Sequence, residues 1–201
     1  HIHDRRQRQM CIRDRSGTGH EKALMWSMKN VHAFDRVWIM EEDVHYTDID
    51  FLHQVVTFDY DRDLILHART LNSSYIEWKA LIEFLHKQWE PLHITDWSWA
   101  QLQFFGASKT MIKAMRQTYA DNNNTLLFLE TMWSTVAREN GLKIGGWYSY
   151  FESFSKNFQF RPCHTTFPVP GLYHPAKLRN GSYINCSRPK RRQEDVINIR
   201  L

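Results

Sequence analysis

Short apolar runs alternate with amphipathic segments along most of this 201-residue chain. The runs predicted to be strands, or in one case a strand pair, are 36–40, 63–69, 98–106 and 142–150. The segments that repeat apolar residues at helical spacing are 19–30, 49–57, 75–89 and two stretches capped by Ser108 and Thr125, the second ending at Gly141. This alternation predicts an α/β fold with helices flanking a sheet.

The run Val37–Met40 leads directly into Glu41, Glu42 and Asp43. Its apolar character predicts a strand that is buried on both faces, as in a parallel sheet. Adjacent carboxylates repel one another unless a cation or solvent compensates them, and ligands collect at the carboxyl ends of strands in open α/β sheets. Alternation places Glu41 and Asp43 on one side, where they could bind a hard divalent cation. The alternative is a solvated acidic turn.

Aromatic residues make up 14% of the chain and form two groups, around residues 97–105 and 147–154. Aromatic faces stack on sugars, and Trp97 and Trp147 both lie beside polar, loop-like sequence. These two residues are therefore the candidates for binding a sugar. The alternative for each ring is a place in the hydrophobic core.

The net charge of +4 comes from the two ends of the chain. Residues 1–15 and 188–201 each carry +3, so residues 16–187 carry −2. A slightly acidic central part gives little support to a nucleic-acid partner, and the basic end at 188–201 is interpreted as a disordered tail. Residues 1–15 read like a translated sequencing adapter and are excluded from the predicted domain, which spans 16–187.

Several motifs resemble the GT-A glycosyltransferases, in particular an uncharacterised group of that fold. VWIMEEDVHYT resembles their Asp-x-Asp segment, and GLYHPAK resembles their C-terminal Gly-Leu-x-His-Pro-x-Lys ending. HEKALMWSM, FFGASKTMIKAM and FLETMWSTVARENGL resemble the helix and strand segments around them, in the expected order over about 20–177. The resemblance implies a Rossmann-like mixed sheet flanked by helices. It also implies that the nucleoside-binding half, which precedes the acidic motif in that fold, is missing from this sequence.

The resemblance also implies roles for particular residues. Asp43 and Glu41 would bind Mn²⁺ or Mg²⁺ together with His174, whose alternative is a surface-loop histidine. Glu130 would act as the general base. Glu42 and Lys177 would contact the donor, and the two sugar-binding candidates, Trp97 and Trp147, would then contact the acceptor.

These roles describe a metal-dependent enzyme that transfers a sugar from a nucleotide-diphosphate donor to a glycan or another hydroxyl acceptor. The family's habit and four glycosylation sequons favour the Golgi lumen, with a membrane anchor in the missing N-terminal part, over a bacterial cytosol. One alternative is a non-catalytic luminal glycan-binding module of the same fold. Another is a nucleic-acid-binding protein that uses its basic C-terminal tail.

Overall fold

The computed structural model describes residues 19–41, 44–47, 49–58, 60–67, 71–72, 79–147, 172–173, 178–179 and 182–183. The chain divides into two compact units, the first formed by 1–41 and 50–152 and the second by 42–49 and 153–201. No helix among the described residues is long and apolar enough to span a bilayer.

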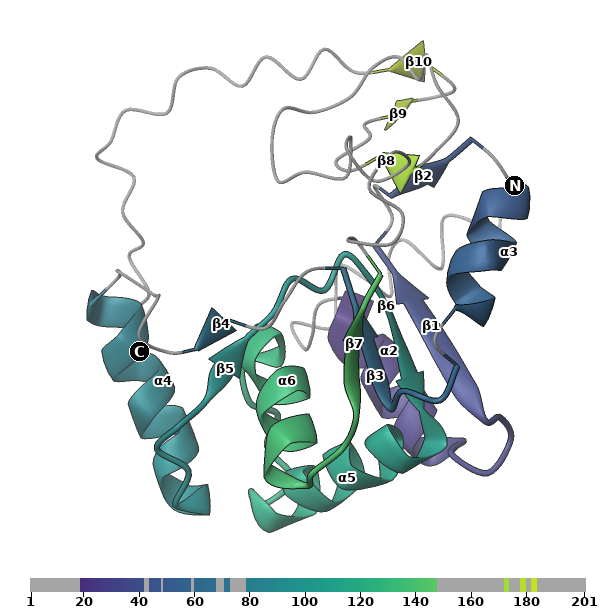
Figure 1. Ribbon diagram of the computed structural model, residues 1–201. Coiled ribbons are helices and arrows are strands. Elements are labelled where there is room, and N and C mark those ends of the chain that lie inside the picture. Colours follow the sequence, from purple (N-terminus) through teal and green to yellow (C-terminus); the bar gives the residue numbers. More distant parts are fainter. Residues whose placement is uncertain are drawn as a thin grey trace, which may run out of the picture. The chain divides into compact units, whose positions relative to one another are not determined.

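The first unit is built on a four-stranded mixed sheet (Figure 1). Its strand order is β1 (Arg36–Met40), β6 (Phe104–Ser108), β3 (Leu64–Leu66) and β7 (Ile144–Gly146). Strand β6 runs antiparallel to both β1 and β3, whereas β3 and β7 are parallel. Strands β1, β3 and β7 therefore point the same way, and their carboxyl ends lie at one edge of the sheet. The predicted mixed α/β architecture is confirmed at this level.

Strand β1 forms at the predicted residues, but its place in the sheet differs from the prediction. It forms where the apolar run predicted a strand, but among the described residues its one neighbour is the antiparallel β6, so it lies at the side of the sheet. Its residues are mostly half-buried, and Ile39 alone is fully covered. The apolar run predicts a strand covered on both faces, but a run of five residues does not distinguish that position from an edge position.

Three helices cover one face of the sheet: α2 (Gly19–Lys29), α5 (Lys109–Asp121) and α6 (Leu129–Glu139). Ile39, Phe105 and Leu64 on this face belong to the same buried cluster as apolar residues of all three helices. The ring centroids of Phe105 and Trp133, a residue of α6, are 4.9 Å apart. This layer of helices on a sheet supplies the main core of the unit.

The opposite face of the sheet carries a row of aromatic rings. The Trp38 and Phe104 centroids are 5.1 Å apart, and those of Phe104 and Trp147 are 5.8 Å apart. Gly106 lies beneath the Trp38 indole in the register that pairs the two residues. A residue without a side chain at position 106 therefore lets the indole lie against the strand.

The remaining helical elements of the first unit are α3 (Ile49–Thr57), α4 (Lys79–Trp89) and a 3₁₀ turn at Glu90–Leu92. The first residue of α3 belongs to the second unit. The first unit also contains a strand pair, β4 (Leu71–Asn72) with β5 (Ser98–Trp99).

In the second unit, β2 (His45–Tyr46) pairs with β8 (Leu172–Tyr173), and β9 (Leu178–Arg179) pairs with β10 (Ser182–Tyr183). Helices α3 and α4 agree with the helices predicted at 49–57 and 75–89. The stretch 98–106 holds β5 and the first residues of β6, but these two strands belong to different sheets and do not pair with each other. The residues just before α4 lie outside the described part.

Two helix-cap predictions are confirmed and one is wrong. Ser108 accepts a hydrogen bond from the Met111 amide at 3.1 Å and begins α5, and Gly141 adopts a φ of 62° just after α6. Thr125 does not cap α6, because that helix begins only at Leu129 after the extended Phe128. The Phe128 amide donates instead to Gln88 Oε1 at 2.6 Å, so a contact from α4 holds the start of this helix.

Replacing Gly106 with alanine is expected to destabilise the first unit by about 1–3 kcal/mol, because the new Cβ would lie 2.9 Å from the Trp38 ring. Gly146→Ala is the matched control, since its Cβ would meet only a backbone oxygen at 3.9 Å and should change stability by less than about 0.5 kcal/mol. Denaturant unfolding of both variants measures the difference. Equal stability of the two would show that the Trp38 packing does not constrain position 106.

Candidate functional site

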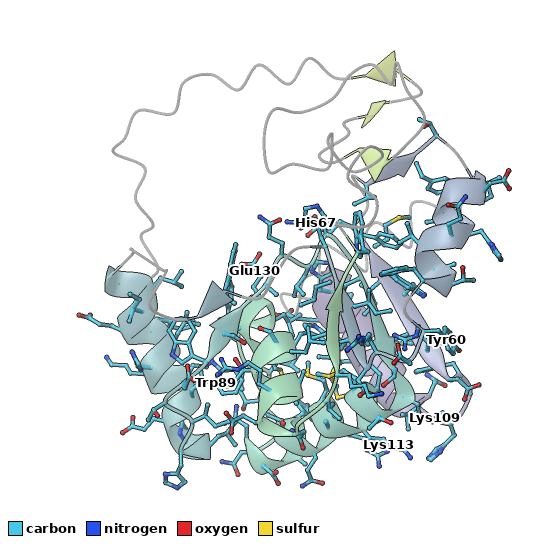
Figure 2. The ribbon with its side chains drawn as sticks, viewed as in Figure 1. Tyr60, His67, Trp89, Lys109, Lys113 and Glu130 are labelled. Atoms are coloured by element: carbon cyan, nitrogen blue, oxygen red, sulfur yellow. The ribbon has the colours of Figure 1, made fainter. Side chains whose placement is uncertain are left out.

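Polar side chains gather at the edge of the sheet where β1, β3 and β7 end. The antiparallel β6 begins at this edge, and so do helices α2 and α6. Figure 2 shows Glu130 and His67 at this end of the unit and Lys109 and Lys113 at the other end. We call five residues here, His20, Glu41, Trp99, Gln103 and Glu130, the edge cluster.

Glu41 follows the last residue of β1 and continues its pairing with β6. The Glu41 amide donates to the Gln103 carbonyl at 2.8 Å, so these two residues lie directly opposite each other. Opposite residues of an antiparallel pair have their side chains on the same face. That face also carries Ile39 and Phe105, and the helices cover it. The Glu41 carboxylate is therefore held among the helix termini, with 34% of its side chain exposed.

Glu130 lies in the first turn of α6. Its Oε2 accepts a hydrogen bond from the indole Nε1–H of Trp99 at 2.9 Å, and its main-chain carbonyl accepts from the Ala100 amide at 2.8 Å. Burial raises the pKa of the Glu130 carboxyl, the Trp99 hydrogen bond opposes that rise, and the Glu41 charge adds to it. The carboxyl is thus held in place by Trp99 and made more basic than an ordinary glutamate.

His20 supplies the third titratable side chain of the edge cluster. Its Nε2 lies 3.7 Å from Glu41 Oε1, and its ring meets Phe105 edge-on at 6.0 Å. Burial lowers the pKa of the imidazole, and the Glu41 charge partly offsets this effect. Near neutral pH the cluster therefore combines a neutral imidazole with two carboxyl groups.

Gln103 adds a buried neutral acceptor beside Glu41. The residue is 5% exposed, and its Oε1 accepts no hydrogen bond from the part of the chain that the structure describes. An unsatisfied buried amide oxygen costs about 1–3 kcal/mol. Such a group calls for a partner from outside these residues.

The structure brings together two of the residues that the sequence singled out. Glu41 and Glu130, 89 positions apart in the sequence, lie close enough for the charge of one to shift the pKa of the other. Asp43, Glu42, His174 and Lys177 lie outside the described residues. Within the described residues, no group of three His, Cys, Asp or Glu side chains is arranged to hold a metal ion.

Trp97 and Trp147, the predicted acceptor-binding residues, are both fully buried. The Trp97 ring meets His86 edge-on at 5.9 Å, and the Trp147 Nε1–H donates to the Phe104 carbonyl at 3.2 Å. Their positions agree with the core alternative weighed for each ring, so the acceptor role gains no support. The half-buried ring beside the carboxyl is Trp99, two residues after Trp97.

The sequence patterns do not indicate a specific role for His20, Trp99 or Gln103. Each carried a weak signal: His20 lies inside a helix-start motif, Trp99 belongs to the first aromatic group, and Gln103 is a polar residue next to a buried strand. None of these signals indicates which distant residue the side chain meets. The cross-strand pairing of Gln103 with Glu41 becomes visible only once the strand order is known.

No protein-family model matches this chain, and no significant match is found among curated proteins or solved structures.

Replacing Glu130 with glutamine is expected to stabilise the protein at neutral pH. The folded state raises the pKa of this carboxyl, so its stabilising contribution is complete below the unfolded pKa, near 4.5, and is lost as the pH rises through the folded-state value. Glutamine keeps an oxygen for Trp99 but cannot ionise. The gain in melting temperature should therefore be present at pH 7 and vanish near pH 4.

Glu139→Gln is the control, because Glu139 is an exposed carboxylate at the other end of the same helix. Its effect on the melting temperature should vary much less between the two pH values. A Glu130→Gln variant that is less stable than the parent protein at pH 7 would contradict the buried-carboxyl interpretation.

Proposed function

We propose that this protein takes part in a metal-dependent transfer of a sugar from a nucleotide-diphosphate donor to a hydroxyl acceptor, as the GT-A resemblance implies. The observation that supports the proposal best is the Glu130 carboxyl. It is partly buried, held by Trp99, raised in pKa, and set close to Glu41 at the carboxyl edge of the sheet. Ligands of open α/β sheets collect at this edge.

Glu130 is the proposed general base. Trp99 holds Oε2, which leaves Oε1 to accept the proton of an acceptor hydroxyl as that oxygen attacks. A base is most effective when its pKa lies near the working pH, and burial moves the pKa of Glu130 in that direction. Positioned proton transfer of this kind contributes about 10²–10⁴-fold to the rate.

Glu41 is the described member of the proposed metal site. Its carboxylate is partly exposed, and oxygen ligands suit Mn²⁺ and Mg²⁺. Asp43 and His174 complete the set that the sequence predicts, with Glu42 and Lys177 on the donor. When bound, the cation would neutralise the charge of the departing nucleotide diphosphate.

The edge cluster supports sugar transfer better than it supports glycan binding without catalysis. A module that only holds glycans has no need of a buried carboxyl whose ionisation costs stability. The two tryptophans on which that alternative depended, Trp97 and Trp147, are covered by other residues. The nucleic-acid alternative depends on 188–201, which lies outside the described residues.

Glu130→Gln is expected to lower the rate of sugar transfer by about 10²–10⁴-fold while leaving donor binding unchanged, because glutamine cannot accept the proton. The assay follows nucleotide release from sugar-nucleotide donors with Mn²⁺. Asp43→Ala should abolish the Mn²⁺-dependent release.

The exposed Glu139→Gln variant should retain the parental rate. In the parent protein, the rate should rise as the pH passes through the pKa of Glu130, which lies above that of an ordinary glutamate. A parental rate of transfer in Glu130→Gln would show that Glu130 is not the general base. Turnover that is indifferent to Mn²⁺ and to Asp43→Ala would overturn the metal-dependent transfer.

A further inference from the structure

Helix α2 carries apolar side chains on two opposite sides. Leu24 and Met28 are buried in the core, as expected for a helix that covers a sheet. Met25 and Trp26 lie on the other side of the helix, where they are 41% and 56% exposed. A helix at the surface of a globular protein normally turns polar residues toward solvent. The outward position of Met25 and Trp26 therefore needs an explanation other than core packing.

The Trp26 ring is held in place by a neighbouring ring. It stacks on Phe34, with the ring centroids 6.1 Å apart and the ring planes 14° apart. Phe34 is itself partly buried and packs against the hydrophobic core. One face of the indole is therefore fixed by the protein, while more than half of the residue stays exposed to solvent.

Two exposed lysines flank these apolar side chains. Lys22, Trp26 and Lys29 are spaced by four and three residues, so they lie along one face of the helix. Of the two acidic residues nearby in the sequence, Glu21 is half-buried and Asp35 forms a 3.0 Å salt bridge with a lysine of α5. Positive charge therefore lies on both sides of the exposed indole. Four residues make up what we call the outer face of α2: Lys22, Met25, Trp26 and Lys29.

We propose that the outer face of α2 is a contact surface for an anionic lipid membrane. Met25 and Trp26 would enter the headgroup layer, where tryptophan is favoured because it combines an apolar ring with a polar N–H. The two lysines would hold their ammonium groups at anionic headgroups while their methylene stems lie along the apolar side chains. Each basic residue near such a surface strengthens binding about fivefold.

The charge and the size of this face favour a membrane over a protein partner. A second copy of the chain would bring lysines against lysines, which is unfavourable. A stable protein interface takes about 20–30 residues from each partner, whereas α2 exposes two large apolar side chains. Shallow insertion into a headgroup layer requires no more than such a small projection. The expected contact is weak and reversible, and it does not rest on the proposed sugar transfer.

Vesicle co-sedimentation of the full chain tests this contact. The parent protein should bind vesicles of phosphatidylcholine with phosphatidylserine and should bind vesicles of phosphatidylcholine alone much less. Trp26→Ser should weaken binding to the anionic vesicles about tenfold, because a large apolar side chain is lost. Replacing Lys22 and Lys29 together with glutamine should weaken it about 25-fold. Circular dichroism verifies that each variant is folded.

Helix α4 supplies the matched controls. Phe84 is an aromatic residue that is 46% exposed, and Lys87 is exposed on the same helix. Phe84→Ser and Lys87→Gln should therefore bind anionic vesicles like the parent protein. As a direct measure of insertion, bromine-labelled phosphatidylserine should quench the tryptophan emission of the parent protein and quench that of Trp26→Phe much less.

Three results would overturn the proposal. No binding to anionic vesicles, or equal binding to vesicles without phosphatidylserine, would exclude an anionic membrane as the partner. Binding that is unchanged in both α2 variants would assign the contact to the basic segments 1–15 or 188–201. Tighter binding to poly-glutamate than to vesicles, lost in the same α2 variants, would indicate an acidic protein as the partner.

Discussion

The antiparallel pairing of β1 with β6 is the constraint on which the rest of the first unit depends. The ladder extends one residue beyond β1 at each end, because the Lys109 amide donates to the Asp35 carbonyl and the Glu41 amide donates to the Gln103 carbonyl, both at 2.8 Å. Side chains alternate along a strand, so a slip of one residue would move every side chain of β1 to the other face. Ile39 would leave the core and Glu41 would leave the edge cluster. One register therefore determines both the packing of the sheet and the position of its carboxylate.

Packing on both faces holds this register. On the helix-covered face, Phe105 lies against Trp133 of α6 and His20 of α2. On the other face, the Trp38 indole fits over Gly106, the one position of β6 without a side chain. Alternative registers would set the indole against a larger residue of β6. The helix termini that bring His20 and Glu130 to the edge are thus placed by the same contacts that align the strands.

Local signals in the sequence predicted most of the elements, because helical spacing and caps are properties of neighbouring residues. Ser108 begins α5 as expected, since its hydroxyl reaches an amide only three residues away. Thr125 failed as a cap because Gln88, which is distant in sequence, binds the Phe128 amide. The same limit applies to the site. Motifs indicated Glu41 and Glu130, but they do not indicate that Trp99, and not Trp97, donates a hydrogen bond to Glu130, because that depends on how α6 packs. Burial of Trp97 and Trp147 is a result of tertiary packing, which no local pattern reports.

The charge of Glu41 links the two halves of the proposed chemistry. Glu130 owes its raised pKa first to burial and then in part to the negative charge of Glu41, whereas the Trp99 hydrogen bond acts in the opposite direction. A cation bound at Glu41 would cancel that part of the effect and lower the pKa of Glu130. Glu130 would then ionise more readily once the metal and donor are in place, and it would hold its proton more tightly in their absence. In the proposed mechanism, the ionisation of Glu130 would therefore depend on whether a cation is bound at Glu41, without any movement of the backbone.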